Sequence, residues 1–377
     1  MKRIDDFLAI IGISGINIIT KLKNRFFRVA ILTSIIIFIM LGLSMLKFKL
    51  QPIDTIQNKN IKTEIREALA VNAIPAIINP KFESVKATAY SQDELVFFIK
   101  IGDQIKGYPS SILNWHEIVN DEIGGIKIIV TFDPISYTAA AYERNNSIFG
   151  VSGKLYKNNL VMYSNETDTL WSQLTGIQLQ EIKSGETQDS ANVISLKQIP
   201  ILRITFKEFN KQFPNGLILS HDQGFNRDYN ENPYDDYLKS DDIGIFGDTA
   251  SDERLEQKKI IYGIHIGSHS RAYSQDILDD GITNDFISDI PILIFNDNKT
   301  QLFSSFYREF NGDTLTFKKG ITSFTTIDDR TQTTWSLIDG MALAGQLKGS
   351  KLEQIPGIIS FWFAWSDFYP NTEIYRD

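Results

Sequence analysis

The sequence contains no cysteine among its 377 residues and only four histidines. The absence of cysteine excludes disulfide bonds, thiolate catalysis, cysteine-bound metals and a lipid attached through a cysteine side chain. It does not exclude an oxidising compartment, because a fold can form there without disulfides.

Basic residues are scarce outside the N-terminal region. Residues 1–50 hold eight Lys or Arg and two acidic residues, which leaves 30 basic and 44 acidic residues in the other 327. The remainder has no basic patch for a phosphate backbone, which argues against nucleic acid as a partner. The basic N-terminal segment suits anionic lipid, with an acidic domain standing away from it.

One long apolar run is present at residues 29–46, VAILTSIIIFIMLGLSML, and it has no charged residue, Pro, Asn or Gln. At roughly 1.5 Å per residue it reaches about 27 Å, close to the thickness of the bilayer core. We predict a single transmembrane helix there. No small-residue cleavage site follows it, so we expect an uncleaved anchor.

The flanking charges predict the orientation of this anchor. Four cations, at 21, 23, 25 and 28, precede the run closely, and Lys47 and Lys49 follow it. By the positive-inside tendency, residues 1–28 are expected in the cytoplasm and the bulk of the chain outside it, in the periplasm or at the cell surface. Residues 7–20 form a second apolar stretch, either an interfacial helix or an extension of the hydrophobic N-terminal helix.

The remainder of the chain contains an apparent internal duplication. Gly102 and Tyr108 recur as Gly267 and Tyr273, each 165 positions later. The segment IKIIVTFD is similar to IPILIFND, and TLWSQLTG is similar to TTWSLIDG. Each copy ends with an aromatic segment followed by Pro-Asn. Matched blocks in the same order predict two homologous repeated modules.

The residue patterns predict an α+β fold that is mainly β. Residues 95–101, 126–132, 260–266 and 291–295 have the composition of strands. Helices are expected at 110–121, in TEIREALAVNAI at 63–74, and in the two closing segments before Pro214 and Pro370. The predicted organisation is a basic cytoplasmic or interfacial segment (1–28), a transmembrane anchor (29–46), a spacer (47–75), a first module (76–219), an Asp/Asn-rich connecting loop (220–258) and a second module (259–377).

Five blocks of sequence resemble a family of bacteria and archaea catalogued as domain of unknown function 3179. They are NWHEIVNDEIGG, FGVSGKLYKNNLVMY, DTLWSQLTG, NRDYNENPYDDY and FWFAWSDFYPNTEIY, within about residues 74–377. The resemblance implies an extracytoplasmic domain and no established reaction. It also implies a Cys-Pro-x-Cys pair after the first long strand, and here Asp133 and Ser136 replace both thiols. Redox or soft-metal chemistry of such a pair cannot be transferred to this chain.

The candidate catalytic residues surround His116, which the second module does not repeat. Glu117 and Asp121 are positioned to orient the imidazole, and Asp133 and Ser136 follow the next strand. A hydrolase or a metal-dependent enzyme is one interpretation of this set. A buried histidine bonded to the backbone is the other, and no complete nucleophile–base–acid set is recognisable.

Two further sets of residues are candidates for binding. Asp228, Asn230, Asn232 and Asp236 have the alternate spacing of oxygen ligands, which permits a Ca²⁺ site, although the pattern departs from an EF-hand and an Asx-turn loop explains it equally. Tyr156, Tyr163 and Trp171 are candidates for lining a ligand pocket, with core packing as the alternative.

The function predicted from these observations is a membrane-anchored extracytoplasmic module that binds a membrane-protein partner or a small ligand. The interface between the two modules is the place where a pocket is expected. The alternative is the hydrolase or metal-dependent enzyme centred on His116.

Overall fold

The computed structural model describes residues 65–376, except 89, 180–192, 248–251, 276–277 and 279–280. The predicted anchor at 29–46, the segment 1–28 and residues 47–64 of the spacer lie outside these residues. Within them, no helix has the length and apolar character needed to cross a bilayer. The fold is mainly β, as predicted, and the four α-helices in the described part span five to seven residues each.

The first module follows a short strand, β1 (Ile65–Glu67). Its elements in chain order are β2 (Phe82–Ser84), η1 (Val85–Ala87), β3 (Leu95–Ile101), β4 (Gln104–Pro109), α5 (Ser110–His116), β5 (Ile118–Ile123), β6 (Ile126–Asp133), β7 (Thr138–Glu143), β8 (Phe149–Tyr156), β9 (Asn159–Ser164), β10 (Leu170–Ser172), β11 (Gln178–Leu179), β12 (Gln198–Ile199), β13 (Leu202–Thr205), α6 (Phe206–Gln212) and β14 (Leu217–Leu219).

The connecting loop contains α7 (Asp235–Lys239). The second module then continues with β15 (Ile260–Ile266), β16 (His269–Ser274), β17 (Gly281–Ile287), β18 (Ile290–Asp297), β19 (Leu302–Tyr307), β20 (Glu309–Phe310), β21 (Asp313–Thr314), β22 (Phe317–Lys319), β23 (Thr325–Asp328), β24 (Thr334–Ser336), β25 (Ala342–Ala344), β26 (Ile358–Phe361), α8 (Trp362–Phe368) and β27 (Glu373–Ile374).

The same strand arrangement occurs in both modules. The order β13-β3-β4-β14 in the first matches β26-β15-β16-β27 in the second. The antiparallel meander β5-β6-β7 matches β17-β18-β19, and the sheet β8-β9-β10-β11 matches β22-β23-β24-β25. Each module therefore has three parts: a sheet built on one hairpin (β3–β4 or β15–β16), a three-stranded meander (β5–β7 or β17–β19) and a further antiparallel sheet (β8–β11 or β22–β25).

Individual hydrogen bonds also match between the modules. The Tyr108 hydroxyl donates to Asp121 at 2.8 Å, and the Tyr273 hydroxyl donates to Asp285 at 2.7 Å. The cation that completes each pair is Lys106 in the first module and Arg271 in the second. Both pairs are largely buried, so the hydroxyl and the cation together compensate the carboxylate for its lost water.

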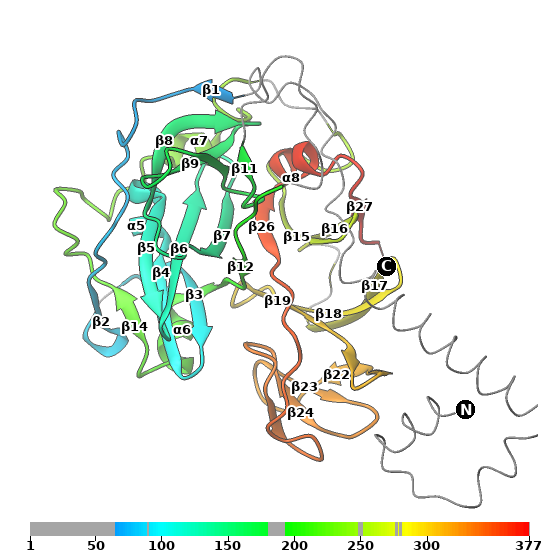
Figure 1. Ribbon diagram of the computed structural model, residues 1–377. Coiled ribbons are helices and arrows are strands. Elements are labelled where there is room, and N and C mark those ends of the chain that lie inside the picture. The colour runs from blue at the N-terminus through cyan, green and yellow to red at the C-terminus, as the bar shows by residue number, and fades with distance from the viewer. Residues whose placement is uncertain are drawn as a thin grey trace, which may run out of the picture. The chain divides into compact units, whose positions relative to one another are not determined.

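Each module uses the closing strand of its β3–β4 or β15–β16 sheet to contact the meander of the other module. β26 of the second module pairs with β7 of the first, where the Phe361 N–H donates to the Ser136 carbonyl at 2.9 Å. β13 of the first module lies along β19 of the second, where the Thr205 N–H donates to the Thr300 carbonyl at 3.1 Å. Figure 1 shows β26 between β7 and β15, so one sheet continues from one module into the other.

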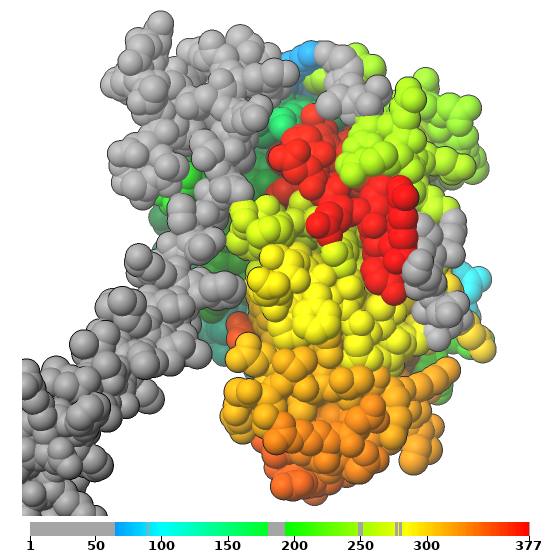
Figure 2. Space-filling view, turned by 90° about the vertical axis from the view of Figure 1, so that its right-hand side faces the viewer, coloured from blue at the N-terminus to red at the C-terminus, as the bar shows by residue number. Residues whose placement is uncertain are grey.

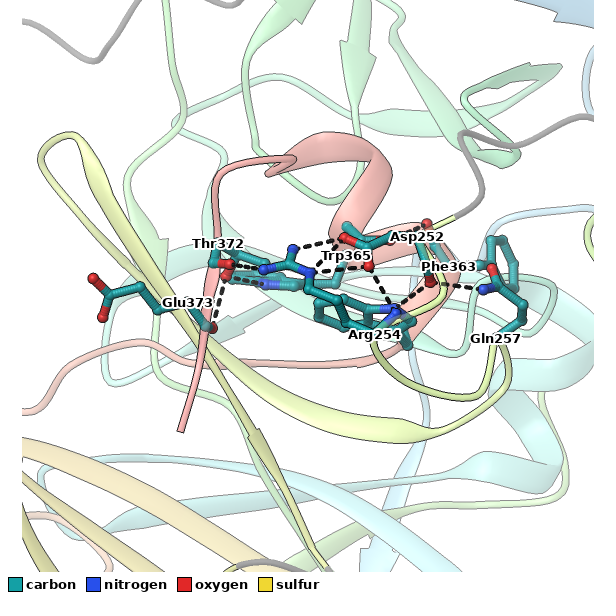
Figure 3. A network of polar contacts seen from close by, with 9 residues as sticks. Asp252, Arg254, Gln257, Phe363, Trp365, Thr372 and Glu373 are labelled. Carbon is teal, nitrogen blue, oxygen red and sulfur yellow. Dashed lines mark hydrogen bonds and ion pairs between the residues drawn. The ribbon is translucent and has the colours of Figure 1, made fainter. Parts of the chain in front are cut away.

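The closing segment of the second module is held by the end of the connecting loop. Arg254 lies between Asp252 and Thr372 and donates from Nη1 to the Thr372 carbonyl at 2.8 Å (Figure 3). The indole of Trp365 donates to the Thr372 hydroxyl at 3.0 Å. These bonds fix α8 and the chain that follows it, and both closing helices end before their prolines, as predicted.

One predicted helix is confirmed only in its first half, and another is wrong. The helix expected over 110–121 ends at His116, because Glu117 has a φ of 56° and the chain continues as β5. The predicted helix at 63–74 contains β1 instead, which pairs with Tyr156–Lys154 of β8. In both places pairing with a neighbouring strand outweighs the local helix preference.

Candidate functional site

His116 lies at the end of α5 and is completely buried. Its Nδ1 is 2.6 Å from the Pro75 carbonyl oxygen, and its Nε2 is 2.7 Å from the Tyr229 hydroxyl. A carbonyl oxygen can only accept, so Nδ1 carries the hydrogen and Nε2 accepts from the tyrosine. Burial lowers the pKa of His116, which favours this neutral imidazole.

Glu117 follows immediately and points to a different partner. Its side chain is buried, and its Oε1 accepts a hydrogen bond from the Tyr234 hydroxyl at 3.0 Å. Burial, with a smaller contribution from the charge of Asp133, raises the pKa of Glu117 to about 8. Glu117 is therefore mostly protonated at neutral pH.

Asp133 ends β6 and accepts several hydrogen bonds. Its donors are the Ile135 and Leu160 N–H groups, both at 2.9 Å, the Ser136 hydroxyl at 2.7 Å and the Asn159 amide at 3.1 Å. Burial raises the pKa of Asp133, and these donors oppose that rise. Asp133 and Ser136, which occupy the expected positions of a thiol pair, are thus bonded to each other.

A buried polar network extends from Asp133 to neighbouring strands. The Asn159 amide donates to Gln173 Oε1 at 2.8 Å, and the Gln173 amide donates to the Thr131 hydroxyl at 2.9 Å. In the second module the positions equivalent to Thr131, Thr138 and Gln173 are Phe295, Leu302 and Leu337. The network is therefore a property of the first module, while the second has apolar packing at the same places.

The connecting loop covers this region with three tyrosine hydroxyls. Tyr229 bonds to His116, Tyr234 bonds to Glu117, and Tyr237 donates to the Ile135 carbonyl at 2.8 Å. The composition of residues 220–258 predicts a connecting loop and does not predict this contact. The signal for it was present, because NRDYNENPYDDY is one of the blocks that carry the family resemblance.

Asp121 is separated from the other candidate catalytic residues. Its carboxylate binds Lys106 at 2.8 Å and the Tyr108 hydroxyl at 2.8 Å. No hydrogen bond joins it to His116 among the described residues. The structure thus brings Glu117, Asp133 and Ser136 together beneath the loop, and gives Asp121 the ion-pair role that Asp285 has in the second module.

The predicted ligand-binding aromatics do not share one pocket. Tyr156 is buried against Phe368, and Trp171 is buried against Phe149. The Tyr163 hydroxyl instead contacts the side chain of Asn72 at 2.7 Å. None of the three lines the cleft described below, and ligand binding by them stays a prediction.

The predicted calcium loop has the hydrogen bonds of Asx turns. Asp228 Oδ1 accepts from the Asn230 N–H at 3.0 Å, and Asn232 Oδ1 accepts from the Tyr234 N–H at 3.0 Å. In the described parts of the chain, no three His, Cys, Asp or Glu residues are grouped as a metal site. A looser site that uses Asp228, Asn230, Asn232 and Asp236 stays a prediction.

An open cleft of about 430 Å³ lies where the two modules meet. The first module contributes mainly apolar side chains from β3 and the 199–202 segment, and the second contributes Ile338 and residues 351–354. Lys100, on the wall of the cleft, pairs with Asp339 of the second module. None of His116, Glu117, Asp133 and Ser136 lines the cleft, and none of the lining residues was predicted as a site residue.

Comparison with protein families matches residues 71–372 to the family described as "Protein of unknown function (DUF3179)". The chain belongs to this family. No curated protein and no solved structure matches the chain. The DUF3179 match covers both modules and the connecting loop, so the network, the tyrosines and the cleft all lie within the family domain. The family description states no activity, and function has to be argued from the geometry.

Proposed function

We propose that this DUF3179 protein is a membrane-anchored extracytoplasmic binding module whose ligand occupies the cleft between its two modules. The cleft carries the proposal, because it is open and formed jointly by both modules. Its volume falls in the range of small-molecule sites, which are concave, mostly apolar and provided with a few polar groups.

The lining of the cleft indicates the chemistry of a ligand. Phe98, Leu202 and Ile338 supply apolar contact, while Lys351 and Glu353 supply one charge of each sign to the lining. A compact molecule with an apolar body and polar groups of both signs, such as a short peptide or an amino-acid derivative, matches this lining. The apolar part supplies affinity through buried area, and the charges fix the orientation.

An enzyme centred on His116 and Glu117 is the second candidate. One observation favours it, since a carboxyl group with a pKa near 8 can exchange a proton at neutral pH. Against it, both ring nitrogens of His116 are bonded to protein groups, and Ser136 is completely buried. A substrate would have to displace the tyrosine loop to reach these residues.

The membrane anchor and the duplication belong to the same proposal. The apolar run at 29–46 and its basic flank support a single anchor with the modules outside the cytoplasm. The matched blocks, the matched strand orders and the paired Tyr–Asp bonds support descent of the two modules from one duplicated unit. A loss of the polar network from the second module explains why only the first module contains it.

Calcium is proposed only as a ligand of the loop at Asp228, Asn230, Asn232 and Asp236. Binding to the folded state would raise the melting temperature in millimolar Ca²⁺ and the rise would disappear on chelation. An unchanged melting temperature would remove calcium from the account and leave the Asx turns as the role of these residues.

The ligand site is tested by screening a fragment library against the full-length chain in nanodiscs by ligand-observed NMR. Lys351→Ala and Glu353→Ala should each weaken the hits at least several-fold, because each removes one of the two charges. Lys348→Ala is the matched control, an exposed lysine of the same segment outside the cleft lining. Fragments that still bind both cleft variants but no longer bind His116→Ala would place the ligand site at the buried network instead of the cleft.

A further inference from the structure

An extended arm, residues 65–78, covers two strand edges of the first module. Ile65–Glu67 pair with the outer edge of β8. Farther along, the Ile77 N–H donates to the Ile118 carbonyl at 2.9 Å, and the Asn120 N–H donates to the Ile77 carbonyl at 2.8 Å. The arm thus forms a parallel bridge to β5, and the Ile77 side chain is buried beside it.

The equivalent edges of the second module belong to β17 and β22. Both strands end their sheets, and in the described part of the chain no strand pairs with their outer sides. Hydrogen bonds of an asparagine side chain join β17 to β22, as they join β5 to β8 in the first module. Asn284 exchanges two hydrogen bonds with the backbone of Phe317, as Asn120 does with Phe149.

The exposed residues differ at the two edges. Glu122 of β5 is exposed and charged, and the equivalent residue of β17 is Phe286, which is 49% exposed. Proteins normally protect a free edge with charge or a covering segment, because unpaired N–H and C=O groups accept further strands. Figure 2 shows the yellow part of the chain, which contains β17 and β18, at the surface on this face of the molecule.

We propose that the outer edge of β17 binds an extended peptide strand of a partner protein, by strand addition parallel to β17. The first module shows the geometry, in which Ile77 bridges Ile118 and Asn120. The equivalent positions are Ile282 and Asn284, so the partner segment should place an aliphatic residue between them. Two copies of β17 related by a two-fold axis could pair only antiparallel, so the parallel strand is not the β17 edge of a second copy.

The test uses a synthetic peptide with the sequence of residues 72–80, NAIPAIINP, as the probe. The peptide carries a bromoacetyl group on an added C-terminal lysine, and the full chain carries a single cysteine, Phe286→Cys. Because the chain has no other cysteine, alkylation reports only this position. Glu122→Cys is the matched control, at the equivalent exposed position of the edge that the arm already covers.

The proposal predicts that the peptide labels Phe286→Cys at least tenfold faster than Glu122→Cys. It also predicts that a peptide N-methylated at the residue corresponding to Ile77 loses this preference, because the N–H to the strand is gone. Fluorescence anisotropy of both peptides with the unmodified chain gives the same comparison without a substitution.

Equal labelling at the two cysteines, or equal binding of the methylated peptide, would overturn strand addition at β17. A dimer of the chain alone in sedimentation, abolished by Phe286→Asp, would make a second copy the occupant and would also overturn the proposal. These outcomes do not involve Lys351 or Glu353, so they are independent of ligand binding in the cleft.

Discussion

Glu117 is a buried carboxyl group whose environment shifts its pKa strongly. Its folded pKa is about 8, against an ordinary value of 4.5. The folded state therefore keeps a proton that the unfolded state releases between these values. Stability is unaffected by Glu117 below about pH 4.5, falls as the pH rises towards 8, and levels off above that. The fall is on the order of 5 kcal/mol, since the pKa differs by about 3.5 units and each unit corresponds to about 1.4 kcal/mol.

Glu117→Gln should remove this pH dependence. Glutamine has the shape of the protonated side chain and cannot ionise, so the variant should match the native chain at pH 4.5 and melt at a higher temperature at pH 8.5. Thermal unfolding followed by circular dichroism across this pH range measures both. Glu122→Gln, on the exposed side of β5, is the control. Parallel pH profiles for the native chain and Glu117→Gln would contradict the assignment.

Part of the candidate site was predictable at the level of residues. The asymmetry of His116 between the copies, together with Asp133 and Ser136 at the end of a strand, pointed to the region where the polar network lies. The role of Asp121 was not predictable, because its partners Lys106 and Tyr108 come from the preceding strand. Contacts of the tyrosine loop depend on residues more than 100 positions apart, which local patterns do not encode.

At the scale of elements, strands were more predictable than helices. The ranges 95–101 and 260–266 coincide with β3 and β15, because buried strands carry a continuous apolar and β-branched run. The helix predicted at 110–121 is present only as far as His116, and the second half of the segment is a strand. Ile118 and Val119 fit the face of a helix, yet they pair with Thr131 and Val130 of β6. Periodicity alone cannot show which partner a short apolar segment will find.

The contact between β15 and α8 provides a prediction at this scale. A Cβ on Gly263 would lie 2.5 Å from the ring of Trp365, whose side chain is fully buried. Gly263→Ala should therefore destabilise the chain by about 1–3 kcal/mol, because a rigid indole cannot move away. Thermal unfolding measures the loss. Adding Trp365→Leu should reduce the penalty of Gly263→Ala, and an equal penalty in both backgrounds would contradict the contact.

At the scale of the whole molecule, the sequence predicts a pocket at the interface between the two modules, and the cleft is lined by residues of both. Its lining residues were not predictable, because they come from segments as far apart as 98–102 and 351–354. The pairing of β26 with β7 could not be predicted from the sequence either, since it joins residues that are 220 positions apart.

The orientation across the membrane is a prediction that the described residues do not test. If residues 1–28 are cytoplasmic, protease added to spheroplasts should digest the modules and leave the N-terminal segment intact. An epitope tag at each end, read by immunoblotting, measures this, with detergent-lysed spheroplasts as the control. Survival of the C-terminal tag beside loss of the N-terminal tag would reverse the topology.

Ligand binding in the cleft can be measured by native mass spectrometry of the full-length chain, extracted from its own membrane into nanodiscs. We expect a bound small molecule on the native chain and on His116→Ala, and its loss from Lys351→Ala and Glu353→Ala. A molecule that stays on both cleft variants and leaves His116→Ala would exclude the cleft as the binding site and place binding at the buried network beneath the tyrosine loop.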